Sequence, residues 1–282
     1  MVALLYLLNV GCSSGQLALS KLYANRGGQA AAFNLHKAAA ALVVFLLFGL
    51  FQGMTWNAPT VWYGIGYGVF LSLSMHAGFV ALSIGPMAFT SIIASFSLII
   101  PFVCGVTVWQ EPLTVYSVIG MLLLLSSIVL LNVKKDKQIS FKWLFYALIT
   151  MVANGACSLV QKFHQVAYPT LYRTEFMLAA MATVLLFLVA MGLVKRNVAP
   201  SGKPTFSVLG ALSGVLNGGA NYIVLYLAAT EKSSVLFPVV SVANVVAVWL
   251  VGRLAFRERF RPLQIVGLLL GIAAIVLLNI QR

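Results

Sequence analysis

The sequence predicts an all-α polytopic membrane protein whose ten transmembrane helices form an inverted repeat of five plus five helices. Three observations support this prediction: the composition, ten separate apolar segments, and the sorting of basic residues among the joints between those segments. Hydrophobic residues make up 61% of the chain and charged residues 8%, whereas soluble domains carry about 25% charged residues. The composition excludes a soluble enzyme, a disordered chain and a disulfide-stabilised secreted domain.

The apolar segments have the length that a membrane helix needs. About 20 residues of α-helix cross a hydrocarbon core of about 30 Å. The joints between them are short and polar or contain Pro and Gly, so none forms a soluble domain. The predicted segments are 2–22, 31–51, 61–83, 87–109, 114–133, 142–162, 174–194, 206–229, 233–254 and 262–280.

Lys and Arg residues are sorted strongly between the two sets of joints. Of the 18 basic residues, 14 lie at the joints that follow segments one, three, five, seven and nine, and four lie on the other side. The positive-inside rule predicts that the odd-numbered joints are cytoplasmic and that both termini lie outside the cytoplasm. The formal net charge of +13 thus reflects membrane topology and predicts no nucleic-acid partner.

An internal repeat relates the two halves of the chain. A shift of 147 residues aligns 61–132 with 208–279, repeats the letters IVLLN, and places Glu111 on Glu258. Five helices per half is an odd number, so the second half enters the membrane inverted, and equivalent joints should carry opposite charge. The joint around Glu111 has no basic residue, whereas the joint around Glu258 has four. We predict a first five-helix repeat over 1–133, a cytoplasmic basic linker over 134–141 and a second repeat over 142–282.

Short motifs at equivalent places in the two halves resemble the drug/metabolite transporter superfamily, specifically its EamA-type transporters. The resemblance implies a central cavity lined by helices 1, 3, 4, 6, 8 and 9, with helices 5 and 10 as packing or dimer elements. It leaves open whether the chain is a monomer or a homodimer. The motifs are Gly15-Gln16 with Lys21, Asn154-Gly155 with Gln161-Lys162, Glu111-Pro112, and Arg257-Glu258-Arg259.

The sequence predicts no cofactor, no metal site and no enzymatic activity. The three histidines, His36, His76 and His164, lie in different segments, so they do not have the spacing of metal ligands. The single aspartate, Asp136, lies in the linker, which leaves no Ser/His/Asp set for acyl transfer. The chain has no GxxxxGK[ST] phosphate loop, so its cargo moves down a gradient or is coupled to an ion gradient.

His76 is the ionisable side chain placed deepest in an apolar segment. Intramembrane ionisable residues are expensive to keep, and imidazole titrates near physiological pH, which suits proton coupling. Alternatively, His76 is a neutral imidazole hydrogen-bonded across a helix interface. Proton coupling predicts a pH-dependent transport rate that His76→Gln flattens.

Polar residues recur at equivalent positions of the two halves. Asn221 aligns with Ser74, Asn244 aligns with Ser97, and Asn217 shares a helix face with Asn221. This recurrence predicts surfaces turned toward one cavity, whereas the alternative for each residue alone is hydrogen bonding between helices. The predicted substrate-binding residues are His76, Ser97, Asn154, Asn217, Asn221 and Asn244.

Four charged residues at helix ends and joints are predicted to act as gate or structural residues. Lys21 and Lys162 end equivalent segments, where their side chains can extend to the lipid headgroups. Glu111 and Glu258 can each cap the N-terminus of the helix that follows. We also expect Pro101 and Pro238 to be able to break their helices.

These observations predict a secondary transporter of the inner cell membrane that moves small organic metabolites by alternating access. Export of amino acids or similar metabolites is the activity that the family resemblance implies. The predicted partners are a small-molecule substrate, the lipid bilayer and, through His76, protons. The alternative function is a flippase of lipids or lipid-linked substrates with the same fold. An enzyme within the membrane is disfavoured, since the five acidic residues are spread over separate segments.

Overall fold

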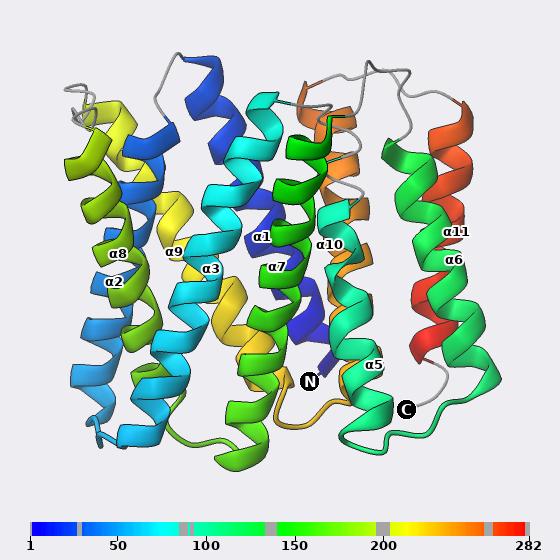
Figure 1. Ribbon diagram of the computed structural model, residues 1–282, viewed down its shortest axis with the longest axis horizontal. Coiled ribbons are helices and arrows are strands. Elements are labelled where there is room, and N and C mark those ends of the chain that lie inside the picture. Colours follow the sequence, from blue (N-terminus) through cyan, green and yellow to red (C-terminus); the bar gives the residue numbers. More distant parts are fainter. Residues whose placement is uncertain are drawn as a thin grey trace. The chain divides into compact units, whose positions relative to one another are not determined.

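The computed structural model describes residues 2–26, 30–84, 90, 93–132, 140–195, 204–256 and 262–279. These residues form ten α-helices and one short 3-10 helix, and no strand occurs among them (Figure 1). The helices are α1 (Val2–Asn25), α2 (Ala30–Gln52), α3 (Ala58–Ile84), η1 (Phe96–Leu98), α5 (Ile99–Thr107), α6 (Val115–Asn132), α7 (Phe141–Ala167), α8 (Arg173–Lys195), α9 (Pro204–Leu227), α10 (Ser233–Phe256) and α11 (Pro262–Asn279).

The chain is a multi-pass membrane protein. Within the described residues, α1, α2, α7, α8 and α9 each contain a stretch long and apolar enough to cross a membrane. Many large apolar side chains point outward, including Phe51, Phe141 and Leu186, as lipid-facing side chains do. Trp56 and Trp62 are exposed near the start of α3, where an interfacial anchor is expected. The prediction of an all-α polytopic membrane fold is thus confirmed.

The two prolines expected to break helices behave differently. Pro101 lies in the first turn of α5, directly after the 3-10 turn η1. Proline has no N–H to donate to the carbonyl of Ser97, four residues earlier, so a tighter 3-10 turn replaces the α-helical one. Pro238 lies inside α10, which runs unbroken from Ser233 to Phe256, so the expected break at Pro238 is wrong.

The described helices form two compact units. The first unit contains Met1–Ser72 and Val160–Ala229, and the second contains Leu73–Leu159 and Thr230–Arg282. The boundaries fall inside α3 and α7, so each of these helices contributes to both units. Each unit combines segments of both predicted repeats, so the compact units and the repeats at 1–133 and 142–282 divide the chain differently. The division into repeats remains a prediction from the sequence.

In the first unit, glycines bring helix backbones into close contact. α9 packs against α1 and α2, and α2 also packs against α8. A Cβ atom on Gly214 of α9 would overlap the carbonyl oxygen of Lys37 on α2. A Cβ on Gly64 of α3 would lie 2.6 Å from the carbonyl oxygen of Phe176 on α8. Small residues at helix interfaces drive packing in membranes, where apolar burial alone cannot.

The second unit is built on α6, α10 and α11. α6 and α11 lie side by side (Figure 1), and α10 contacts α5, α6 and α11. The hydroxyl of Ser127 on α6 donates a 2.6 Å hydrogen bond to the carbonyl of Gly267 on α11. At the start of α7, Trp143 Nε1 donates to Thr90 Oγ1 at 2.8 Å. Polar side chains thus join segments of this unit that lie far apart in the sequence.

Candidate functional site

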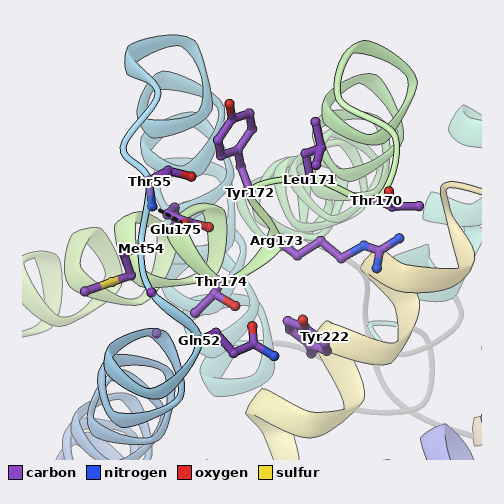
Figure 2. A pocket seen from close by; sticks show the side chains of 12 residues that line it. Gln52, Met54, Thr55, Thr170, Leu171, Tyr172, Arg173, Thr174, Glu175 and Tyr222 are labelled. Carbon is purple, nitrogen blue, oxygen red and sulfur yellow. Dashed lines mark hydrogen bonds between the residues drawn. The ribbon is translucent and has the colours of Figure 1, made fainter.

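A polar pocket of about 370 Å³ lies within the first unit (Figure 2). Three segments form its walls: the end of α2 with the joint that follows it, residues 170–175 at the start of α8, and Tyr222 on α9. Ligand pockets are typically about 300–1,000 Å³, so this pocket has room for a small metabolite.

Two tight turns shape the mouth of the pocket. Gly53 ends α2 with φ of 77°, a left-handed conformation that glycine adopts without strain. Between α7 and α8, Thr170 and Tyr172 also have positive φ, 65° and 53°. A non-glycine residue in this region is under local backbone strain, and such strain concentrates at functional sites. The turn delivers Arg173, the first residue of α8, directly onto the pocket wall.

Arg173 is a buried cation that pairs with no carboxylate in the part of the chain that the structure describes. Only 8% of the residue is exposed. Its Nε donates a 2.9 Å hydrogen bond to Gln165 Oε1, and its guanidinium lies 4.3 Å from the centre of the Tyr226 ring on α9. Its Nη2 is buried and has no hydrogen-bond partner. Arg173 thus lines the pocket while one of its donors is buried without a partner.

A chain of hydrogen bonds fixes the orientation of this group. Because Arg173 only donates, Gln165 must turn its oxygen toward Arg173 and its amide nitrogen toward His164 Nδ1, 2.9 Å away. His164 Nδ1 is therefore an acceptor, and His164 is the neutral tautomer with its proton on Nε2. That nitrogen lies 3.2 Å from the Thr60 hydroxyl on α3, to which it donates. The network links α3, α7 and α8.

His164 is fully buried among aromatic rings. Its ring centroid lies 4.7 Å from that of Phe176 and 5.7 Å from those of Tyr63 and Tyr168. These rings and the two hydrogen bonds leave the imidazole no freedom to rotate. His164 is thus a positioning residue for Gln165 and, through it, for Arg173.

Glu175 places a negative charge on another wall of the same pocket. Its Oε1 accepts a 3.1 Å hydrogen bond from the backbone N–H of Thr55, which ties α8 to the joint between α2 and α3. In Figure 2 the side chains of Arg173 and Glu175 extend to different sides of Thr174. The cation and the anion of this pocket are therefore held apart by separate partners.

Two of the six predicted substrate-binding residues lie in the first unit. Asn221 Oδ1 accepts a 2.7 Å hydrogen bond from the Tyr67 hydroxyl on α3, and Asn221 Nδ2 donates to the Asn217 carbonyl at 2.9 Å. Asn217 and Asn221 thus share a face of α9, as predicted. Asn221 directly precedes Tyr222, whose ring lines the pocket and stacks on Phe45 at 6.0 Å.

The other four predicted residues lie in the second unit. Asn154 on α7 accepts a 2.6 Å hydrogen bond from Ser74 on α3. Asn244 on α10 has a buried Oδ1 with no hydrogen-bond partner. His76 on α3 and Ser97 in η1 are both half-buried. Within the described part of the chain, Asn217 and Asn221 are the two predicted site residues that a hydrogen bond joins.

Comparison with known proteins supports the membrane-transporter fold. Residues 141–280, about half of the chain, match the model of the EamA-like transporter family. The chain belongs to this family. A solved structure, described only as a crystal structure of a protein, matches with a TM-score of 0.78 at 17% identity, over 99% of this chain and 96% of that chain. No curated protein sequence matches. The predicted resemblance to the drug/metabolite transporter superfamily is confirmed, and the family is one of transporters rather than enzymes.

In this EamA-like chain, Glu111 caps a different helix from the expected one. Its carboxylate accepts hydrogen bonds from the backbone N–H groups of Ser233 and Ser234 at 2.7 and 2.8 Å, and from the Ser234 hydroxyl at 2.5 Å. Glu111 therefore caps α10 and not α6, the helix that follows it. α6 has its own cap, because Thr114 and Ser117 exchange backbone-to-hydroxyl hydrogen bonds at 3.3 and 3.2 Å.

The remaining predicted gate or structural residues have different outcomes. Lys162 is buried in α7, with 8% of the residue exposed, and its role as a gate or structural residue stays a prediction. Glu258 lies outside the described residues. The backbone of Lys21 belongs to α1, but its side chain is outside the described part.

The sequence did not predict the pocket of this EamA-like protein, because the positions of its basic residues were explained by membrane topology alone. The sequence indicates only that Arg173 is one of the four basic residues on the other side and that His164 lacks the spacing of a metal ligand. The available signal was the run from His164-Gln165 to Arg173 and Glu175, which places two polar helix-end residues and two opposite charges around a Tyr-Pro turn. That such residues meet in one pocket depends on contacts between distant helices, which the sequence does not show.

Proposed function

We propose that this protein is a secondary transporter of the inner membrane that exports small organic metabolites, such as amino acids, by alternating access. The observation that carries the proposal is the division of the helices into two compact units, each with polar side chains buried among membrane helices. Transporters of inverted-repeat architecture change access by moving one bundle as a nearly rigid body against the other. Buried polar groups in such helices are expensive and usually serve transport.

Orientation and coupling belong to the same proposal. The positive-inside rule places the basic linker at 134–141 in the cytoplasm, so the joint after α2 and the joint after α7, which both border the pocket, face outside. Protons are the proposed coupling ion and His76 on α3 the proposed proton-carrying residue. Export is the direction implied by the family resemblance.

The test is counterflow of the twenty amino acids, each isotopically labelled, in proteoliposomes containing the full chain. We expect accumulation of a subset of them, and Asn221→Ala and Asn154→Ala should each reduce the initial rate without loss of inserted protein. Tyr67→Phe and Ser74→Ala are the matched controls, because each removes the same hydrogen bond but keeps the asparagine. If an asparagine contacts the substrate, its alanine variant should have a lower initial transport rate than the matched control.

Equal rates within both pairs would show that these asparagines only join helices, and would reject them as site residues. Transport that is independent of pH in the wild type, or that His76→Gln leaves pH-dependent, would reject proton coupling through His76. If no amino acid accumulates but fluorescent phospholipid exchanges between leaflets, the flippase alternative replaces the metabolite exporter.

A further inference from the structure

We propose that the pocket of the first unit binds the carboxylate of a zwitterionic cargo on Arg173, with the cargo's ammonium directed toward Glu175. This inference rests on the proposed transport function and names the chemical class of the cargo. None of the predicted substrate-binding residues lines this pocket. Arg173 and Glu175 therefore form a recognition site in addition to those residues.

The first step is the charge balance of the first unit. Of the five acidic residues of the chain, Glu175 alone falls within Met1–Ser72 and Val160–Ala229. Its Oε1 is engaged by the Thr55 N–H, and no ion pair joins Glu175 to Arg173. A buried guanidinium without an anion is unfavourable, and this unit has no further carboxylate to supply. The carboxylate of a cargo can therefore supply the charge that the residues of this unit do not.

The second step is the preparation of the guanidinium for a planar anion. Gln165 holds Nε and the Tyr226 ring supports the guanidinium, while Nη2 stays buried without a partner. The His164–Thr60 contact fixes Gln165 in turn. A guanidinium held in this way loses little conformational freedom when it binds a carboxylate, and arginine binds carboxylates and phosphates through paired N–H donors.

The third step explains why the pocket should bind a zwitterion with a carboxylate and not a phosphate. Glu175 lines the same pocket, so a phosphate dianion or the headgroup of an anionic lipid would meet a negative charge there. A zwitterion instead presents opposite charges to Arg173 and Glu175. The side chains of Thr174, Gln52 and Tyr222 line the pocket and offer further polar groups. The cavity of about 370 Å³ fits a cargo the size of an amino acid.

The test is ligand-induced thermal stabilisation of the full chain in phosphatidylcholine nanodiscs. The probes are leucine and phenylalanine, their carboxamides leucinamide and phenylalaninamide, N-acetyl-leucine and inorganic phosphate. A ligand that binds the folded state raises the unfolding midpoint in proportion to its occupancy. We expect at least one of the two amino acids to stabilise the wild type, and its carboxamide and phosphate to have no effect.

Arg173→Gln should weaken the apparent affinity for that amino acid about 10- to 100-fold, the loss expected for a charged hydrogen bond. Arg173→Lys should weaken it less, because a single ammonium replaces a planar fork. Arg26→Gln is the matched control, since Arg26 is exposed in the turn after α1. Glu175→Gln keeps an oxygen for Thr55 but loses the charge, so it should weaken leucine and spare N-acetyl-leucine.

Unchanged affinity in Arg173→Gln would overturn the proposal, as would stabilisation by phosphate or by phosphatidylglycerol nanodiscs in place of the amino acids. If Arg173→Gln does not fold, Arg173→Lys with wild-type affinity for both the amino acid and its carboxamide overturns it equally. The transport proposal fails separately. Binding without counterflow rejects transport and keeps the site, whereas counterflow that Arg173→Gln leaves intact rejects the site and keeps transport.

Discussion

Arg173 in the first unit and Glu111 in the second are two charged residues that are almost equally buried, at 8% and 9% exposure, yet their partners differ. The carboxylate of Glu111 accepts three hydrogen bonds, all from the N-terminus of α10. The guanidinium of Arg173 has one hydrogen bond and one ring contact, and its Nη2 has no partner.

The difference distinguishes a charge that stabilises the fold, Glu111, from the charge that we propose binds the cargo, Arg173. Glu111 is satisfied by the fixed N–H groups of a helix, which complement a negative charge. Arg173 is fixed in place by its neighbours but not neutralised by them. Burial alone therefore does not distinguish the two charges, whereas the extent of their hydrogen bonding does.

The largest expected effect is that of Glu111→Ala on stability. The substitution leaves the first N–H groups of α10 without their acceptor, and we expect a loss of about 3 kcal/mol in the free energy of unfolding. Unfolding titrations in mixed detergent micelles measure this loss. Glu111→Gln and Ser234→Ala should cost progressively less, since they remove the charge and one of three hydrogen bonds, respectively. If Glu111→Ala leaves the free energy of unfolding unchanged, Glu111 does not stabilise the fold and the contrast with Arg173 is rejected.

A smaller effect is expected where the first unit relies on close backbone contact. Gly64→Ala places a Cβ 2.6 Å from both the Phe176 carbonyl oxygen and the Ala179 side chain, so α3 and α8 must separate. We expect a loss of about 2 kcal/mol, as for overpacking of a core. Gly66→Ala is the matched control two residues along α3, because its Cβ would meet nothing within 4 Å. Ala favours a helix over Gly, so Gly66→Ala should be neutral or stabilising, and equal losses at the two positions would show that contact with α8 is not the cause.

The smallest effect is expected from Ser127→Ala in the second unit. It removes the hydrogen bond from α6 to the Gly267 carbonyl on α11, and such interhelical bonds in membranes contribute about 0.6 kcal/mol on average. Ser126→Ala is its neighbour and control, since the Ser126 hydroxyl is exposed and bonds only within α6, to the Leu122 carbonyl. If Ser126→Ala costs as much, the polar contact between α6 and α11 is not what holds the second unit together.

The sequence was sufficient for the helices and insufficient for the contacts between them. Length and apolarity alone predicted 233–254 and 262–280, close to α10 and α11. The predicted segment 142–162 stopped short of the end of α7, because Gln161 to Gln165 is polar and appeared to end a membrane helix. Thr60 and Arg173 satisfy His164 and Gln165, and this allows the helix to continue to Ala167.

For the site residues, too, the sequence predicted features within one helix but not contacts between helices. The shared face of Asn217 and Asn221 depends on helical spacing, so the sequence could predict it. The partner of Glu111 depends on which helix N-terminus lies within reach of its joint, and that helix begins more than a hundred residues later. The sequence also did not predict the two compact units, because the composition of an apolar segment does not indicate which helices it packs against.

The orientation of His164 has a consequence for observing the protein at work. Each donor in the series from Arg173 through Gln165 to His164 decides the direction of the next, so the imidazole proton records the state of the guanidinium. The ring nitrogens of the two neutral tautomers have distinct magnetic resonance frequencies. A histidine that never touches the cargo can thus serve as a spectroscopic reporter of whether Gln165 stays bonded to Arg173.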